Sequence, residues 1–134
     1  MMYSNAHAIR PAPDVMRSLS LPDHIVPSVL TLVDEACARI LGYYNNADDI
    51  LVDRKADRSP ITAADRAAHD ILCAGLLALC PDIPVLSEES PDDFVAERHR
   101  WDCCWLVDPL DGTREFIGRT DEFTVNVALV WRSR

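Results

Sequence analysis

Two long stretches of the chain carry apolar residues at helical spacing. The first begins near Asp23 and places apolar residues three or four positions apart, along one face of an amphipathic helix: Ile25, Val29, Leu32, Val33, Ala36, Ile40 and Leu41. Pro27 falls in the first turn, where its missing N–H does little harm. Gly42 and the Asn/Asp cluster after it predict the end of this helix.

The second helical stretch follows Thr62, which is a suitable N-cap residue. Asp65 stands three positions later, where an acid can complete a capping box, and Pro81 predicts the end of the helix. The expected apolar face consists of Ala68, Ile71, Leu72, Gly75, Leu76 and Leu79. His69 lies beside this face, where we expect it to have a structural role.

The other apolar segments are short and have the character of strands. We expect a strand or short hairpin in 50–61, and short buried strands in 83–87 and 103–107. From Glu122 to Trp131 apolar and other residues alternate, which is the period of a strand. A polar connector, 91–100, is expected to be helical or irregular. Two helices with strands that end in acidic residues predict a layered α+β domain.

We expect the domain to begin at residue 23, with 1–22 as a flexible arm. The predicted last strand places Phe123, Val125, Val127, Leu129 and Trp131 on one face. We expect this face to lack a covering element within 23–134, which would favour oligomers or poor solubility.

The charge and composition narrow the classes of function. With 22 acids against 13 Lys and Arg, the formal charge is −9, which argues against a nucleic-acid partner and suits a protein that binds cations. The first residues lack the apolar segment of a secretory signal, and no apolar run approaches the length of a membrane span. Five cysteines without a C-x-x-C pair predict reduced thiols and a cytoplasmic protein.

Two carboxylates follow the predicted strand 103–107 in the segment "DPLDG", at Asp108 and Asp111. Asp-Pro and Asp-Gly pairs also form ordinary turns, which is an equally good explanation for these five residues alone. The functional alternative is a Mg²⁺ site, because Mg²⁺ prefers oxygen ligands and the carbonyl of Leu110 is available beside the two acids. Gly112 would let a phosphate approach the backbone, and a helix starting at Thr113 would direct its N–H groups toward it.

Two further acidic clusters lie at the borders of predicted elements. Glu88 and Glu89 follow the strand 83–87, where solvated glutamates are the simpler explanation for the pair alone. Asp65 has a sufficient structural role as a capping residue. Together, however, the three clusters favour a shared site over three unrelated surface features.

Three motifs carry a resemblance to a known family. "SPITAAD" (59–65), "VLSEES" (85–90) and "WLVDPLDGTREF" (105–116) resemble, in order and spacing, the magnesium-dependent inositol monophosphatase superfamily. "TREF" after the Asp-Gly pair is similar to the bacterial 3′(2′),5′-bisphosphate nucleotidases within it. The similarity covers about residues 24–131. It implies a sandwich of alternating helix and sheet layers (αβαβα), with only its N-terminal layers in this chain.

The resemblance also implies roles for individual residues. Glu88 would bind the activating metal and help to orient a water, while Asp108 would bridge two Mg²⁺ ions. The Leu110 carbonyl and Asp111 would complete the metal ligands from this part of the chain. Thr113 and Asp65 would polarise the water. The backbone N–H groups of Gly112 and Thr113 would hold the phosphate.

The implied reaction is hydrolysis of the 3′-phosphate of 3′-phosphoadenosine 5′-phosphate, which gives AMP and phosphate. An inositol or sugar phosphate is the alternative substrate. The family has another metal-binding aspartate downstream, in a "W-D-x-A" segment that 23–134 does not contain. A truncated, inactive protein is therefore a third hypothesis. The resemblance implies a cytoplasmic protein, with the cytoplasmic face of the inner membrane as an alternative location.

Overall fold

A computed structural model describes residues 21–46, 52–55 and 60–131. The predicted arm 1–22 lies almost wholly outside these residues. The elements, in chain order, are α1 (Ile25–Asn45), β1 (Val52–Arg54), β2 (Pro60–Thr62), α2 (Ala63–Leu79), β3 (Val85–Ser87), α3 (Asp92–Ala96), the 3₁₀ helix η2 (Glu97–Arg100), β4 (Cys103–Asp111), α4 (Thr113–Gly118) and β5 (Thr124–Trp131). The mixed helix and strand content and the order of the elements confirm the predicted α+β class.

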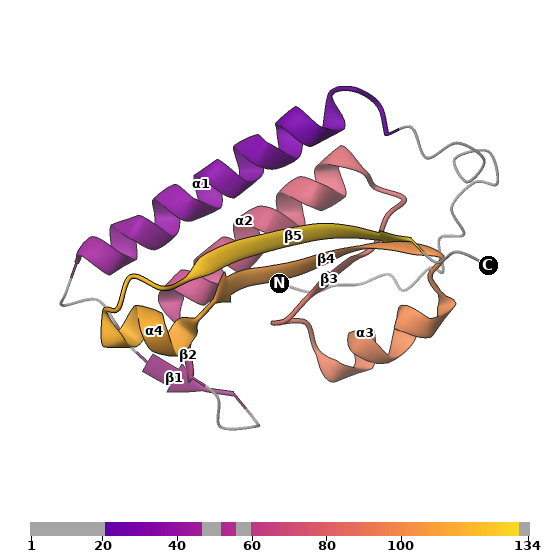
Figure 1. Cartoon of the computed structure of the whole chain (residues 1–134). Helices are drawn as coiled ribbons and strands as arrows, with labels where there is room; N and C mark the ends of the chain where they lie inside the picture. Colours follow the sequence, from indigo (N-terminus) through magenta and orange to yellow (C-terminus); the bar gives the residue numbers. More distant parts are fainter. Residues whose placement is uncertain (1–20, 47–51, 56–59, 132–134) are drawn as a thin grey trace.

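A three-stranded sheet with the order β3-β4-β5 forms the centre of the described structure. β3 is parallel to β4 and β5 is antiparallel to it, whereas β1 and β2 form a separate antiparallel hairpin. The long helices α1 and α2 lie side by side and pack against one face of the sheet (Figure 1). The described residues therefore form a helix layer on a sheet layer, with α4 and the hairpin near one end.

The helix layer packs closely because of Gly75 on α2. A Cβ atom at this position would lie 2.3 Å from Cδ2 of Leu32 on α1, so a larger residue would require the Leu32 side chain to move. Leu72 and Leu76 on either side of this contact are fully buried. The apolar face predicted for the second helix is thus largely the face that packs, and the predicted start at Thr62 is confirmed.

The first helix ends within the predicted segment. It continues through Gly42 to Asn45, so it ends in the Asn/Asp cluster and not at the glycine itself. The physical reason is packing: the ring of Tyr44, in the added turn, lies 5.2 Å from that of Phe116 and 4.9 Å from that of Phe123. Such aromatic contacts can outweigh the modest helix-breaking tendency of one glycine.

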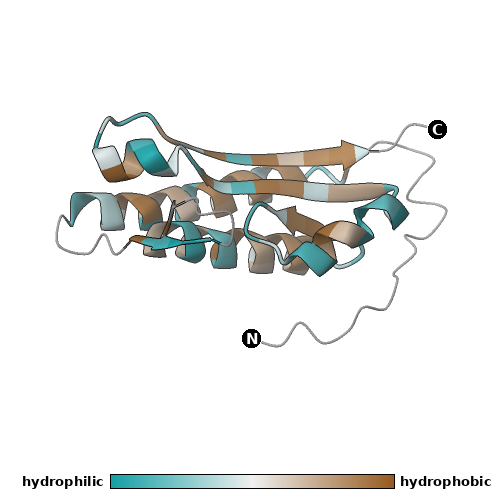
Figure 2. Ribbon diagram, turned by 90° about the horizontal axis from the view of Figure 1, so that it is seen from below, coloured by the Kyte–Doolittle hydropathy of each residue, from teal (hydrophilic) through white to brown (hydrophobic). Residues whose placement is uncertain are grey.

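The two faces of the sheet differ in what covers them, and here the sequence prediction was wrong. Phe123, Val125, Val127 and Leu129 pack against the helices as part of the core. The alternate positions point to the opposite face, where Leu106 and Val130 are 46% and 44% exposed. Figure 2 shows apolar positions along these strands. The uncovered apolar face is therefore the one that carries Leu106 and Val130.

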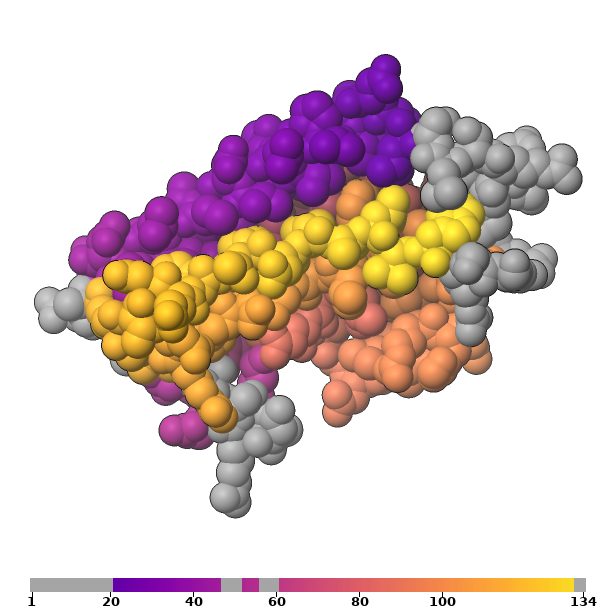
Figure 3. Space-filling view, in the orientation of Figure 1, coloured from indigo at the N-terminus to yellow at the C-terminus, as the bar shows by residue number. Residues whose placement is uncertain are grey.

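Part of this uncovered face is hollowed. A depression of about 650 Å³ lies between the sheet and α3, lined by Leu86 of β3, Leu106 of β4 and Val95 of α3 among others. Figure 3 shows it as a notch between the sheet and the α3 segment. No helix in the described part of the chain is long and apolar enough to span a membrane.

We predict that lysines at Leu106 and Val130 reduce self-association of the chain. Both side chains lie on the uncovered face, so Leu106→Lys with Val130→Lys removes exposed apolar surface and should change the free energy of unfolding by only about 0.5 kcal/mol. The molar mass in solution, measured by light scattering over a concentration series, should fall toward that of a monomer.

Val127→Lys is the matched control, because its side chain points to the helices from the same strand as Val130. It should destabilise the fold by about 2 kcal/mol or more, since it places a lysine against the core. A wild-type chain that stays monomeric at all concentrations would contradict the prediction.

Candidate active site

A tight turn at the end of β3 carries the first pair of acids. The N–H of Ser90 donates to the Ser87 carbonyl (3.0 Å), which places Glu88 and Glu89 at the two central positions of the turn. The N–H of Glu88 donates to the carbonyl of Val107 on β4 (2.9 Å), so the pairing of the two strands extends into the turn. The backbone of Glu88 is therefore fixed next to β4, while its side chain is 53% exposed.

β4 does not stop before its acids, as the sequence predicted, but includes both of them. Asp108 pairs with Asn126 and Asp111 pairs with Thr124, so three residue steps on β4 oppose two on β5. This irregularity contains Pro109, which has no N–H to donate and is tolerated at such bulges. Because the bulge interrupts the alternation, the side chain of Leu110 is buried in the core.

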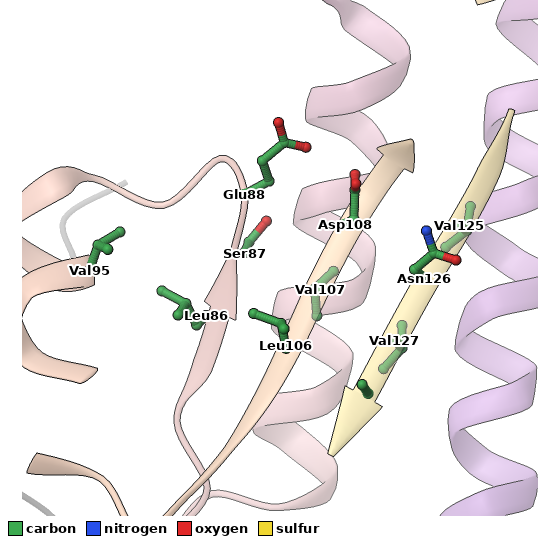
Figure 4. Close-up of a pocket in the computed structure, with 11 residues that line it drawn as sticks. Leu86, Ser87, Glu88, Val95, Leu106, Val107, Asp108, Val125, Asn126 and Val127 are labelled. Carbon is green, nitrogen blue, oxygen red and sulfur yellow. The ribbon is translucent and has the colours of Figure 1, made fainter. Parts of the chain in front are cut away.

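The carboxyl of Asp108 is in an unfavourable environment for its charge. Burial, followed by the neighbouring carboxyl of Glu88 and the charge of Asp111, raises the pKa of Asp108 from 3.8 to about 7. Its Oδ1 atom is buried and has no hydrogen-bond partner within the described residues. Figure 4 shows the Glu88 and Asp108 side chains at the same end of neighbouring strands. A cation would relieve both the repulsion and the missing contact.

Asp111 affects Asp108 through its charge but borders a different part of the surface. It borders a second depression together with Gly112, Glu115 and Asp121. Its Oδ2 accepts a hydrogen bond from Nδ2 of Asn126 (3.3 Å), the residue that pairs with Asp108 across the strands. Among the described residues, no three His, Cys, Asp or Glu side chains are grouped closely enough to hold a metal ion. The structure thus brings Glu88 and Asp108 together, and a site that also includes Asp111 and the Leu110 carbonyl stays a prediction.

Asp65 and Thr113 meet although 48 positions separate them in sequence. The hydroxyl of Thr113 is 2.8 Å from Oδ1 of Asp65, and it can alternatively donate to the Leu110 carbonyl at 3.3 Å. Oδ2 of Asp65 accepts from the backbone N–H (2.9 Å) and the hydroxyl (2.6 Å) of Thr62. Asp65 is only 1% exposed, so these donors take the place of water around its carboxylate.

Gly112 precedes α4, which begins at Thr113 as the suggested phosphate-binding arrangement requires. Its φ of 92° lies in the left-handed region, and an added Cβ would be 2.7 Å from the carbonyl oxygen of Glu122. A side chain would therefore clash with backbone as well as strain the turn. The structure explains the glycine by close packing of two backbone segments, and its expected role beside a phosphate stays a prediction.

Two residues of this region had no signal in the sequence analysis. Nζ of Lys55 lies 2.7 Å from Oε1 of Glu89 and 3.5 Å from Oε1 of Glu88, so one cation serves both glutamates. Burial raises the pKa of Glu89 above its usual value, although the contacts with Lys55 act in the opposite direction. Asn126 is the second such residue. The sequence analysis placed it at a non-apolar position of the last strand and gave it no role, whereas the structure places it opposite Asp108 and in contact with Asp111.

Comparisons with known proteins identify the family of the chain. A sequence model of the inositol monophosphatase family matches residues 23–134. The 3′(2′),5′-bisphosphate nucleotidase CysQ of Escherichia coli O157:H7 is 51% identical over 106 residues, which are 79% of this chain and 43% of that protein. The chain therefore spans less than half the length of this curated relative.

Two solved structures share the fold. The crystal structure of CysQ from Bacteroides thetaiotaomicron, described as a bacterial member of the inositol monophosphatase family, is 45% identical with a TM-score of 0.62. It is matched over 78% of this chain and 37% of that one. The extragenic suppressor protein suhB from Bartonella henselae is 25% identical with a TM-score of 0.68, over 81% of this chain and 41% of that one.

We predict that Asp108→Asn stabilises the metal-free chain at high pH and has little effect at low pH. The pKa of Asp108 is raised in the folded state, so its contribution to stability is complete below pH 3.8 and is lost as the pH rises through about 7. The variant has no charge to bury. Its melting temperature should exceed that of the wild type by about 3–6 °C at pH 8, as expected for ~1 kcal/mol after allowance for solvent screening.

Circular dichroism melts at pH 4, 6 and 8 in the presence of EDTA measure this difference. Asp70→Asn, on the exposed face of α2, is the control and should show no such trend. Added Mg²⁺ at pH 8 should raise the melting temperature of the wild type more than that of Asp108→Asn. A difference between the two proteins that is the same at every pH would show that the Asp108 carboxyl is not perturbed.

Proposed function

The chain belongs to the inositol monophosphatase family, and we propose that it supplies the N-terminal part of a Mg²⁺-dependent 3′(2′),5′-bisphosphate nucleotidase. The observation that carries this proposal is the pair of neighbouring carboxylates, Glu88 and Asp108, with the unpartnered and buried Oδ1 atom of Asp108. Identity of 51% to a bisphosphate nucleotidase supports the substrate class. The proposed substrate is 3′-phosphoadenosine 5′-phosphate, with AMP and phosphate as products.

The residues present suit a hard divalent cation. Glu88 and Asp108 would hold it first, and Asp111 and the Leu110 carbonyl would add oxygen ligands from the same strand. When bound, Mg²⁺ supplies charge neutralisation for the phosphoryl oxygens and the leaving oxygen, and it acidifies a bound water. Further ligands from beyond the described residues are part of the proposal, since the described residues alone form no group of three.

The chain's own residues would position and deprotonate the attacking water. Oγ1 of Thr113 would accept the proton of the water as its own hydroxyl proton passes along the existing hydrogen bond to Oδ1 of Asp65, so the proton ends on Asp65. The buried Asp65 carboxylate keeps this hydroxyl oriented, because its other oxygen is already occupied by Thr62. We infer that Gly112 and Thr113 offer backbone N–H groups to the phosphate at the start of α4.

A second candidate function is supported by the incomplete ligand set. A chain that spans 43% of its relative and groups no three metal ligands among its described residues could bind a divalent cation weakly without turnover. The two candidates differ in a simple measurement, because only the first predicts activity once the remaining part of a relative is joined to the chain.

We predict that a chimera of residues 23–131 with the remaining C-terminal part of the Escherichia coli O157:H7 relative hydrolyses 3′-phosphoadenosine 5′-phosphate. Phosphate release should depend on Mg²⁺, and kcat/KM should be at least ~10²-fold lower for inositol 1-phosphate. The chain alone should release little phosphate from either substrate. A chimera that prefers inositol phosphate would contradict the proposed substrate, and a folded but inactive chimera would favour the second candidate.

Variants of this chimera test the individual roles. Asp111→Asn should abolish measurable turnover, because it removes a ligand oxygen. Thr113→Ala should lower kcat by ~10²-fold at saturating Mg²⁺ with a small change in the Mg²⁺ concentration needed for half-maximal rate. Asp70→Asn and Thr31→Ala, both on long helices away from the site, are the matched controls. Full activity of Thr113→Ala at saturating Mg²⁺ would refute its assigned role.

A further inference from the structure

One turn after Asp65, α2 makes a second polar contact with the sheet. Nδ1 of His69 lies 2.8 Å from Oγ of Ser87, the last residue of β3. The Sγ atom of Cys73, one further turn along the helix, is 3.6 Å from the same nitrogen. His69 is half-buried and Ser87 is 2% exposed, so the contact is shielded from solvent. Shielded hydrogen bonds hold their partners more firmly than exposed ones do.

Ser87 is the base of the turn that carries Glu88. Its Oγ accepts a hydrogen bond from the N–H of Glu89 (3.3 Å), and its own N–H donates to Oγ of Ser90 (3.0 Å). The contact with His69 therefore connects α2 to the turn through a single hydroxyl. Rotation of this hydroxyl would release both the helix contact and the N–H of Glu89.

We propose that His69 is a positioning residue, which acts through Ser87 to orient the turn so that the Glu88 carboxylate lies beside Asp108. The inference rests on the proposed function, because it takes Glu88 as a ligand of the cation. It adds a residue outside the three motifs that carry the family resemblance. The alternative is that His69 only fills space beside the core, in which case its loss would affect stability alone.

The spacing on α2 gives the contact its geometric significance. Asp65 and His69 are four residues apart, so they lie on the same face of the helix. Asp65 holds Thr113, which follows β4, and His69 holds Ser87, which ends β3. One rigid helix thus sets the positions of both acid-bearing strand ends relative to each other. Outer contacts of this kind typically change metal affinity by about 10- to 100-fold when they are removed.

The test measures binding of Mn²⁺, as a probe for a divalent cation, to the full chain at a temperature at which each variant is folded. Free Mn²⁺ is followed by electron paramagnetic resonance, and the folded fraction by circular dichroism. His69→Phe and Ser87→Ala should each weaken Mn²⁺ binding by about 10-fold. The double variant should be no weaker than either single variant, because both remove the same contact.

Conservative replacements separate positioning from packing. In His69→Asn the side-chain amide nitrogen is as far from Cβ as Nδ1 is in histidine, so it can still reach Ser87 and should restore most of the affinity. In His69→Gln the amide lies one carbon further out and should not restore it. His24→Phe is the matched control at an exposed histidine near the start of α1, and it should bind Mn²⁺ like the wild type.

The outcomes distinguish this inference from the proposed function. If Glu88→Gln binds Mn²⁺ as the wild type does, Glu88 is not a ligand and both proposals fall. If Glu88→Gln binds weakly but folded His69→Phe and Ser87→Ala bind normally, only the positioning role of His69 is overturned. If His69→Phe does not fold, Mn²⁺ binding by Ser87→Ala still tests the positioning role. The difference in Mn²⁺ binding between His69→Asn and His69→Gln tests it as well. Equal loss in Asn and Gln variants would indicate packing and overturn the inference.

Discussion

A buried carboxylate that is fully hydrogen-bonded, Asp65, determines how the described elements meet. It is 1% exposed and accepts hydrogen bonds from Thr62 and Thr113. An unpaired charge at such depth would cost several kcal/mol, so the fold is stable only with these donors in place. The end of β2, the start of α2 and the segment after β4 are thereby held at one point. The proposed site lies next to this point, because the proposal assigns Thr113 to it.

Asp108 on the sheet is the opposite case, since no cation among the described residues stabilises its charge. Asp108 is driven toward its protonated form by burial and by Glu88, whereas Lys55 reaches the two glutamates but is not among the groups that stabilise the Asp108 carboxylate. The carboxylate of Asp65 thus has hydrogen-bond donors on both oxygens. The carboxyl of Asp108 has an oxygen without a partner among the described residues, which a bound cation would supply. Strain of this kind in a hollowed region is typical of a functional site, where binding rather than folding supplies the missing partner.

The sequence predicted those parts of the fold that depend on local pattern. Both long helices, the start of α2 at Thr62 and the strand alternation of β5 followed from spacing and capping residues. The neighbouring positions of Asp65 and Thr113 were expected from the family resemblance, because 48 intervening residues leave no local signal. The contacts of Lys55 and Asn126 could not be predicted, since they depend on how a loop and an edge strand pack around the acids.

Packing between distant segments determines those features that the local pattern did not predict. α1 passes Gly42 because Tyr44 completes an aromatic cluster with residues after β4. The face of β5 that was expected to be uncovered is covered by helices that precede it by many residues. The alternation of apolar residues and their strand propensity indicate which residues share a face of the sheet. They do not determine which of the two faces packs against the helices.

The bulge in β4 links the packing of the core to the positions of Asp108 and Asp111. Up to Val107 the strand alternates regularly, with Trp105 and Val107 buried and Leu106 on the open face. Because side chains alternate between the two faces, the burial of Val107 places the next residue, Asp108, on the open face. Had the alternation continued, Leu110 would also have faced outward. The bulge around Pro109 instead turns its side chain inward, which anchors the segment between Asp108 and Asp111 in the core. The spacing of the two acids is consequently fixed by the burial of one leucine, so a change in the core at Leu110 should disturb the site as much as the fold.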